Sequence, residues 1–204
     1  SALVFDGSQT VANGLQFDNI NGTNILLVDL ANPTITDSSF QLGADEYAIG
    51  RSAAISAYGA GAAITSPFTI SGSTFTGDAE GSCGNNGNGI SMVYVENSYV
   101  ELDNIDIVDN GYGVFFQKSS GELTNSQITV NCAAVDTKGL KQTGDIKHTL
   151  KIEDNIFTTV DGAGITAYDQ AQISASRNTI SGVEKSSGIA IRSSIAALEN
   201  NIIG

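Results

Sequence analysis

The chain has few positively charged side chains and a single histidine, which limits what it is expected to bind or catalyse. It carries 9 Lys and Arg against 22 Asp and Glu, so its formal net charge is −13. An acidic surface repels polyanions such as DNA, and nucleic acid is therefore not an expected partner. With only His148 and no Gly-x-Ser-x-Gly motif, the sequence gives no support for a serine or cysteine nucleophile.

Long apolar runs are also missing. No stretch of about 18 consecutive apolar residues is present, which excludes a membrane-spanning helix and predicts no membrane insertion. No basic segment followed by an apolar one stands at Ser1, so we expect any signal peptide to have been removed already.

The chain contains only two cysteines, Cys83 and Cys132, with no Cys-x-x-Cys motif and no cluster of histidines. This composition does not indicate a zinc site. Two interpretations of the pair stay open. The first is a disulfide, which requires the loop around Cys83 to fold over its neighbour, and the second is a pair of free thiols.

One pattern is written three times at the end of the chain: apolar-x-apolar-x-x-Asn-x-Ile or Phe. The copies are 150–157, 173–180 and 196–203, and their closing residues are Phe157, Ile180 and Ile203. The closing residues stand 23 positions apart each time. A fixed period of this length predicts stacked structural repeats.

The pattern predicts strands. Apolar residues two positions apart lie on one face of a strand, and the Asn interrupts this alternation at a bend. A second strand follows in each period, with Ile165 and Ile189 spaced 24 residues apart. A unit of two short strands cannot close a core alone, but stacked units can when each strand pairs with its equivalent in the next coil. The sequence therefore predicts an all-β parallel β-helix.

Weaker copies extend the pattern toward the N-terminus. The closing apolar residue falls at positions 20, 40, 75, 107, 128, 157, 180 and 203, which predicts about eight coils in one domain spanning 1–204. Long intervals predict insertions at 76–88 and 137–149, and the run 53–64 is a candidate for one more short coil.

These residues resemble a known repeat. The Asn-x-Ile turn followed by Gly-Ile resembles the right-handed parallel β-helix repeat of the pectate-lyase-like superfamily, over roughly 15–203. The resemblance implies an inward ladder of turn residues formed by Ser38, Ser73, Ser126, Asn155, Asn178 and Asn201. The superfamily includes polysaccharide lyases, pectin hydrolases and esterases, uronan epimerases, phage tailspikes, autotransporter passengers and surface proteins. The resemblance is thus specific for the fold and not for the function.

The catalytic motifs of that superfamily are missing from this sequence. There is no paired Asp-Asp of the polygalacturonase type, no Asp-Pro-His-Glu and no Arg-Pro-x-x-Arg. The best calcium candidates are Asp103, Asp106 and Asp109, with Asp136 about one coil later, but the first three span a strand and its bends and so point in different directions. We therefore expect no metal site and no cofactor, with calcium as the one candidate.

Two further sets of side chains are candidates for binding or catalysis. Glu101 and Glu122 precede equivalent leucines, so they are expected to be neighbours on an outward face, where they form either a carboxylate pair or part of a solvated surface. A candidate binding patch combines aromatic residues of two consecutive coils with a local cationic cluster: Tyr94, Tyr112, Phe115, Lys138, Lys141, Lys147 and His148. One of Phe115 and Phe116 must lie outside the core, because adjacent strand residues face opposite ways.

The sequence favours a non-enzymatic extracellular or cell-surface module of the structural, filament or adhesin type, with glycan contacts. The alternative is a polysaccharide lyase or glycoside hydrolase. A third expectation concerns the last coil, where Ala196, Leu198, Ile202 and Ile203 have no following strand in this sequence. We expect this end to meet another copy or another part of the same solenoid.

Overall fold

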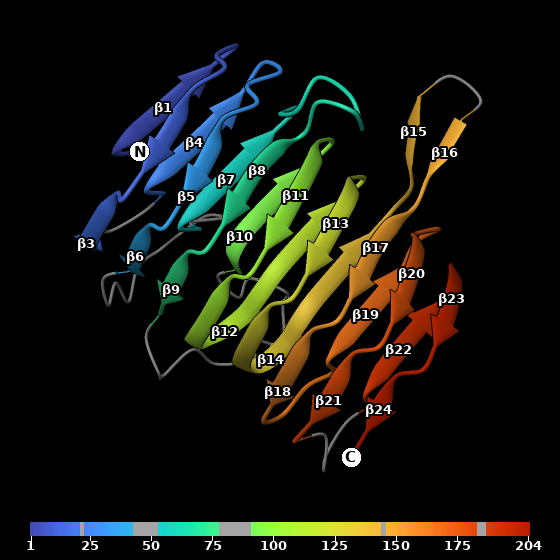
Figure 1. Ribbon diagram of the computed structural model, residues 1–204. Coiled ribbons are helices and arrows are strands. Elements are labelled where there is room, and N and C mark those ends of the chain that lie inside the picture. Colours follow the sequence, from blue (N-terminus) through green and yellow to red (C-terminus); the bar gives the residue numbers. More distant parts are fainter. Residues whose placement is uncertain (21–22, 43–52, 78–90, 144–145, 183–186) are drawn as a thin grey trace.

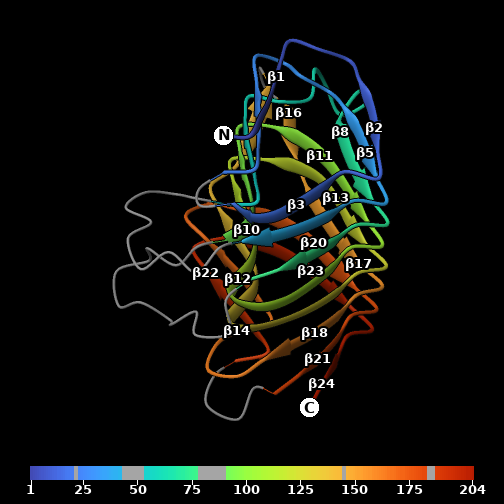
Figure 2. The same ribbon diagram turned by 90° about the vertical axis from the view of Figure 1, so that its left-hand side faces the viewer.

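The computed structural model describes residues 1–20, 23–42, 53–77, 91–143, 146–182 and 187–204. Within these ranges the chain folds into β-strands only, which stack as eight coils from the N-terminus to the C-terminus (Figures 1 and 2). Nearly all strand pairs are parallel, and each strand pairs with its equivalent in the neighbouring coil. The predicted parallel β-helix of about eight coils is confirmed.

Each coil contributes one strand to each of three faces. Face 1 comprises β1 (Leu3–Asp6), β4 (Ile25–Val28), β7 (Ile55–Tyr58), β10 (Ser91–Glu96), the second halves of β12 (Asp106–Gln117) and β14 (Gln127–Lys138), β19 (Ile165–Tyr168) and β22 (Ile189–Arg192). Face 2 comprises β2 (Val11–Asn13), β5 (Thr34–Thr36), β8 (Phe68–Ser71), β11 (Tyr99–Asp103), β13 (Ser120–Thr124), β17 (Leu150–Glu153), β20 (Gln172–Ser176) and β23 (Ile195–Glu199).

Face 3 completes the coil. It comprises β3 (Gln16–Ile20), β6 (Ser39–Leu42), β9 (Thr74–Thr76), the first halves of β12 and β14, β18 (Ile156–Thr159), β21 (Thr179–Ser181) and β24 (Ile202–Ile203). Because β12 and β14 run through the corner from face 3 to face 1 without a break, these two faces form one hydrogen-bonded sheet. The two strands per coil expected from the sequence are therefore three, since the bend at the Asn position divides the first of them.

The corner between faces 2 and 3 is the most regular part of the molecule. It has two residues in all eight coils. The first residue has a positive φ of 48 to 66° at Gly14, Asp37, Gly72, Asn104, Asn125, Asp154, Arg177 and Asn200. Gly, Asn and Asp tolerate this left-handed conformation better than other residues, which explains their frequency there. The second residue points inward and occupies the ladder position.

The register corrects three details of the sequence interpretation. Phe17 pairs with Phe40, so the first coil closes at Phe17 and not at Ile20. Ile105, not Asn104, occupies the ladder position of its coil. The extra coil suggested for 53–64 is wrong, because β7 belongs to the same coil as β8 and β9. In each case a short apolar or turn-rich segment resembles the repeat in sequence, but its residues do not lie at the equivalent positions of the coil.

The core is a stack of closing residues along the axis. Phe17, Phe40 and Phe75 stack ring on ring, with centroids 5.2 and 4.7 Å apart. Ile107, Ile128, Phe157 and Ile180 continue this column and are fully buried. Burying each such side chain contributes about 1.5–3 kcal/mol, so the column is a main source of stability.

The insertion predicted at 137–149 folds as an antiparallel hairpin of β15 (Lys141–Thr143) and β16 (Ile146–His148). It rises from the corner between faces 1 and 2 and projects beyond the stacked coils (Figure 1). The insertion predicted at 76–88 falls largely on residues outside the described ranges. Among the described residues, no helix has the length and hydropathy needed to cross a membrane.

Candidate functional site

The six predicted ladder residues lie in one column inside the corner between faces 2 and 3. Asn155 Nδ2 donates to Asn178 Oδ1 at 2.9 Å and to the Leu123 carbonyl of the preceding coil at 3.0 Å. Asn178 repeats both contacts, with Asn201 Oδ1 at 2.9 Å and the Ile152 carbonyl at 2.8 Å. Each amide therefore links three coils, and these side chains hold the fold and do not face a ligand.

Serine fills the same position differently. The hydroxyls of Ser38, Ser73 and Ser126 each accept a backbone N–H from the preceding coil at 3.1 Å. Each hydroxyl also donates to the carbonyl two residues earlier in its own chain, at 2.7 to 2.9 Å. A serine therefore joins its coil to one neighbour, whereas an asparagine joins two.

A second, shorter ladder was missed by the sequence interpretation. It lies at the corner between faces 1 and 2, where Ser98 Oγ accepts the Ala60 N–H at 2.9 Å and Ser119 Oγ accepts the Ser98 N–H at 3.2 Å. Both serines directly follow residues of positive φ, Asn97 and Lys118. The same order of residues marks the first ladder, so this signal was present in the sequence.

The outer surface of face 1 carries a row of aromatic residues across its strands, which we call the aromatic cluster. Its members are Tyr58, Tyr94, Tyr112, Phe115 and Tyr168. The Tyr58 and Tyr94 rings lie 5.6 Å apart, and those of Tyr94 and Phe115 lie 5.5 Å apart and are stacked. Tyr94 is only 4% exposed, whereas the other members are partly exposed. Phe116 is buried in the core, so Phe115 is the outward member of that pair.

Asp136 lies between Phe115 and Tyr168, toward the C-terminal end of this cluster. It pairs in register with Phe115 of the preceding coil and with Thr166 of the next. The Thr166 hydroxyl donates to its carboxylate, and the Tyr168 hydroxyl is a second hydrogen-bond partner. Burial raises the pKa of Asp136 to about 6, against smaller lowering effects of the Tyr168 hydrogen bond and the Lys138 charge.

The tyrosines around Asp136 respond to the same environment. Burial raises the pKa of Tyr112, and the nearby charge of Asp136 adds to the shift. Burial is also the main cause that raises the pKa of Tyr168, followed by the charge of Asp136. Both phenols therefore remain protonated hydrogen-bond donors beside a carboxylate that is desolvated.

The predicted binding patch is divided between two places. Tyr94, Tyr112, Phe115 and Lys138 lie on face 1, whereas Lys141, Lys147 and His148 belong to the hairpin. The Lys138 ammonium lies 3.7 Å from an Asp169 carboxylate oxygen and 5.8 Å from the centre of the Tyr168 ring. Lys138 thus lies at the edge of the aromatic cluster and interacts with both Asp169 and Tyr168.

The hairpin side chains Lys141, Thr143 and His148 have a different role: they hold the hairpin against the stacked coils. Lys141 Nζ donates to the Asn97 carbonyl and to Asn97 Oδ1, both at 2.8 Å, and lies 4.7 Å from the centre of the Tyr99 ring. Burial lowers the pKa of Lys141. The Tyr99 hydroxyl bonds Thr143 Oγ1 at 2.7 Å and His148 Nε2 at 3.2 Å. Lys147 is exposed.

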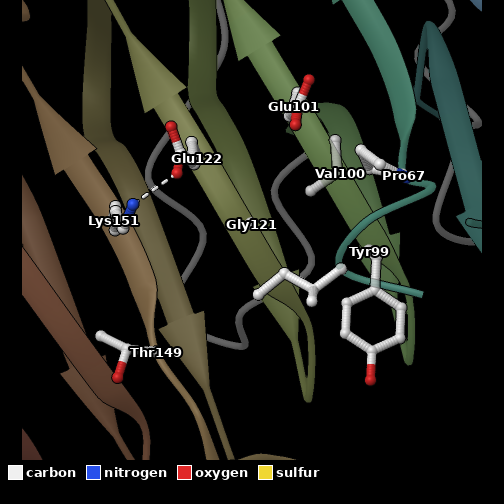
Figure 3. Close-up of a pocket in the computed structure, with 9 residues that line it drawn as sticks. Pro67, Tyr99, Val100, Glu101, Gly121, Glu122, Thr149 and Lys151 are labelled. Atoms are coloured by element: carbon white, nitrogen blue, oxygen red, sulfur yellow. Dashed lines mark hydrogen bonds and ion pairs between the residues drawn. The ribbon is translucent and has the colours of Figure 1, made fainter.

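A shallow pocket of about 60 Å³ lies on face 2 beside the hairpin (Figure 3). Its lining comprises Ile64, Pro67, Tyr99, Val100, Glu101, Gly121, Glu122, Thr149 and Lys151. Glu101, Glu122 and Lys151 stand at the same register position on three neighbouring strands. Lys151 Nζ contacts Glu122 Oε1 at 2.6 Å, and this hydrogen bond is the main cause that raises the pKa of Lys151. Glu101 is exposed beside this pair.

Gly121 forms part of the pocket because the chain needs a glycine there. Its φ is +136°, a backbone conformation that side-chain-bearing residues rarely adopt. A Cβ at this position would lie 1.7 Å from the Val100 carbonyl oxygen of the preceding coil. The glycine thus lets β13 approach β11 closely beside the paired residues Glu101 and Glu122.

The acidic residues considered for calcium do not converge. Asp103 accepts hydrogen bonds from Thr124 Oγ1 and Asn125 Nδ2 at 2.7 Å, at the end of a face 2 strand. Asp106 is exposed on face 3 and Asp136 lies on face 1. In the part of the chain that the structure describes, no three His, Cys, Asp or Glu side chains are grouped to hold a metal ion.

Cys132 lies in β14, near the corner between faces 3 and 1, and is disulfide-bonded. Cys83, the other cysteine of the sequence, lies outside the described residues. The disulfide between Cys83 and Cys132, one of the two interpretations left open by the sequence, stays a prediction.

The sequence interpretation missed two members of the aromatic cluster, Tyr58 and Tyr168, and also Thr166, which bonds Asp136. Tyr168 pairs in register with Lys138 of the neighbouring strand, and Tyr58 pairs in register with Glu96. The insertions at 137–149 and before β10 displaced these residues from the repeat period. Aligning the coils on the two-residue corner would have recovered their positions.

Comparison with known proteins identifies the family of the repeat. The family described as the right handed beta helix region matches residues 46–203. No curated protein and no solved structure matches the chain.

Proposed function

We propose, on the premise that this chain belongs to the right-handed β-helix family, that it is a non-enzymatic extracellular or cell-surface module that binds a glycan at the aromatic cluster. The observation that carries the proposal is the run of aromatic side chains on the outside of face 1. Outward positions of face 3 are mostly Ser, Thr and Gln, which suit a solvated surface. Partly exposed aromatic rings with a few polar groups between them are typical of ligand-binding surfaces.

The accessible part of the cluster has the chemistry that a sugar needs. Tyr112, Phe115 and Tyr168 are partly exposed and offer apolar ring surface. Asp136 and Thr166, which are register partners, provide hydrogen-bond acceptors and a donor. Lys138, which is the register partner of Tyr168, provides a second donor. A sugar ring has apolar faces and a rim of hydroxyl groups, so this mixture of rings and polar groups is complementary to it.

Two observations support an extracellular or cell-surface location. Cys132 is held in a disulfide, a bond that persists mainly in oxidising compartments. The net charge of −13 favours solubility of an exposed solenoid and disfavours anionic partners.

The pocket on face 2 supports a second candidate function, a glycoside hydrolase. Hydrolysis of a glycosidic bond needs two carboxyl groups near the scissile bond. Glu101 and Glu122 are neighbours on paired strands, and Lys151 forms an ion pair with Glu122. Glu101 and Glu122 would then be the two carboxyl groups of the reaction. We rank this candidate second because the pocket is small and shallow.

A glycan array combined with an activity screen separates the two candidates. We expect the wild-type chain to bind glycans without releasing reducing or unsaturated ends, and Phe115→Ala to lose at least tenfold in affinity. Glu101→Gln serves as the matched control, because it changes face 2 only and should bind as the wild type does. Protein-dependent release of reducing ends that is abolished by Glu101→Gln would instead establish the hydrolase.

A further inference from the structure

The carboxylate of Asp136 has acceptor capacity that its neighbours do not use. An ionised carboxylate accepts about four hydrogen bonds, and the described residues supply two donors, the hydroxyls of Thr166 and Tyr168. The nearest cation, Lys138, ion-pairs with Asp169. Asp136 is therefore a partly buried negative charge without an ion-pair partner among the described residues.

The surroundings of Asp136 suit a positively charged group. Phe115 of β12 is the register neighbour of Asp136 on the preceding strand, and Tyr112 of the same strand is close enough for the charge of Asp136 to raise its pKa. On β19, Tyr168 bonds the carboxylate through its hydroxyl, and its ring already has the Lys138 ammonium over it. Aromatic faces attract ammonium groups, and the attraction grows when the site is desolvated. An ammonium at this place would gain the charge of Asp136 and the faces of the rings together.

We propose that the aromatic cluster selects a ligand that carries a protonated amine, so that its preferred glycan is an amino sugar polymer with free amines. This inference rests on the proposed glycan-binding function and specifies its substrate class. The amine donates to Asp136 while the sugar ring lies against Phe115 and Tyr112. An acidic glycan is disfavoured at the same place, because its carboxylate would approach Asp136 on a chain with a net charge of −13.

Alternative uses of Asp136 explain the geometry less well. A structural role accounts for the two hydrogen bonds that the carboxylate accepts from Thr166 and Tyr168 of the next coil, but these use only about half of its acceptor capacity. A catalytic role would require a second carboxyl group across the ligand. The nearest other acid named on this surface, Asp169, is engaged with Lys138.

The preference has a pH dependence whose sign follows from the groups around the site. These groups are Tyr112 on β12, Lys138 on β14, and Tyr168 with Asp169 on or beside β19. The raised pKa values of the two phenols keep them protonated in this range, whereas the pKa of Asp136, about 6, places its titration between pH 5 and 7. Protonation of Asp136 removes the charge that attracts the amine. The preference for amines should therefore decline as the pH falls below about 6.

Calorimetric titration with three oligosaccharides tests the inference: a glucosamine hexamer, an N-acetylglucosamine hexamer and a galacturonate oligomer, all at pH 6.5. We expect the glucosamine hexamer to bind about tenfold more tightly than the N-acetylated one, as one charge-assisted hydrogen bond predicts. The galacturonate oligomer should bind most weakly. At pH 5 the tenfold preference should shrink.

Variants assign the preference to Asp136. Asp136→Asn keeps the size of the side chain, and it should bring the two hexamers to within about twofold while leaving the N-acetylated one unchanged. Asp106→Asn on face 3 is the matched control and should retain the preference. Equal binding of the two hexamers to the wild type overturns the amine inference and leaves the glycan-binding function standing. Binding of no oligosaccharide overturns both.

Discussion

The last three coils and the central coils of the molecule hold themselves together in different ways. The coils that close at Phe157, Ile180 and Ile203 carry asparagine in the ladder position. The central coils, from β10 to β14, carry serine or isoleucine there and add contacts outside the helix, namely a disulfide at Cys132 and the docked hairpin.

The difference shows that one interior amide can replace several external contacts. Asn178 alone makes two side-chain donations and accepts from two groups of the coil before it. Ser126 accepts one backbone N–H and donates within its own coil. Where the ladder contributes less, the hairpin of β15 and β16 supplies further contacts, through Lys141 with Asn97 and through Thr143 and His148 with Tyr99.

The largest expected effect is loss of the disulfide in the central coils. If Cys83 is the partner of Cys132, closure of this loop contributes about 4 kcal/mol of unfolding free energy. Cys83→Ser should then lose this amount in chemical denaturation, and Cys132→Ser should lose more because Cys132 is buried. A double variant that is less stable than Cys132→Ser alone would disprove the pairing, and a reduced wild-type sample should match Cys83→Ser.

The next effect concerns the asparagine ladder. Asn178→Leu leaves the Ile152 carbonyl and the Asn155 N–H without their buried partners and should destabilise the chain by about 3 kcal/mol. Thr179→Leu, at the next position and exposed as the first residue of β21, is the control and should change stability little. If the melting temperatures of the two variants agree, the ladder does not have the role described above.

Asp136 should destabilise the central coils when it is ionised. Its pKa is raised from 3.8 to about 6, so the folded state binds more protons and stability falls as the pH rises between these values. Asp136→Asn should therefore be more stable than the wild type by about 2–3 kcal/mol at pH 7.5 and similar to it at pH 4. Denaturation at both pH values checks this, and a gain at pH 4 equal to that at pH 7.5 would contradict it.

A smaller effect is expected from the contact that docks the hairpin. Lys141→Met keeps the aliphatic stem over Tyr99 but leaves two Asn97 oxygens without their donor, which should cost about 1–2 kcal/mol. Amide exchange in β15 and β16 should become faster. Lys147→Met removes an exposed cation from the same hairpin and should leave exchange unchanged.

The smallest effect concerns the surface of the last coil. Ile195, Leu198, Ile202 and Ile203 are 51 to 66% exposed, and we expect the isolated 1–204 chain to associate weakly through them. Light scattering over a concentration series should show this association, and Ile202→Lys should reduce it. Ile156→Lys changes an equally apolar and 50% exposed residue of face 3 and should not. A wild type that stays monomeric throughout would refute the expectation.

The coil pattern could be predicted from the sequence because its signal is local. Asn155, Asn178 and Asn201 stand at one offset from their closing residues, and a repeated local pattern fixes both the strand and its neighbour in the next coil. The predicted register was wrong at Ile20, where another apolar residue resembled the closing residue. It was also wrong at Ile105, where the ladder residue is apolar and not Asn or Ser.

The candidate site could be predicted only in part, because it depends on which coils become neighbours after the insertions are excluded. Tyr112 and Phe115 lie close in sequence and were found together. Tyr168 meets Asp136 across a hairpin that lies between them in the chain. Likewise, the sequence could not reveal that Lys141 bonds Asn97, which lies two coils earlier, whereas Lys138 lies on face 1.

The two-residue corner between faces 2 and 3 also determines where this chain can change over evolution. It is the one corner whose length is the same in all eight coils, whereas the corner between faces 1 and 2 holds both a tight bend and a whole hairpin. An insertion at the constant corner would displace the ladder and every strand pair after it. New segments can therefore accumulate at the other corners, where peptides could also be grafted as display loops without altering the scaffold.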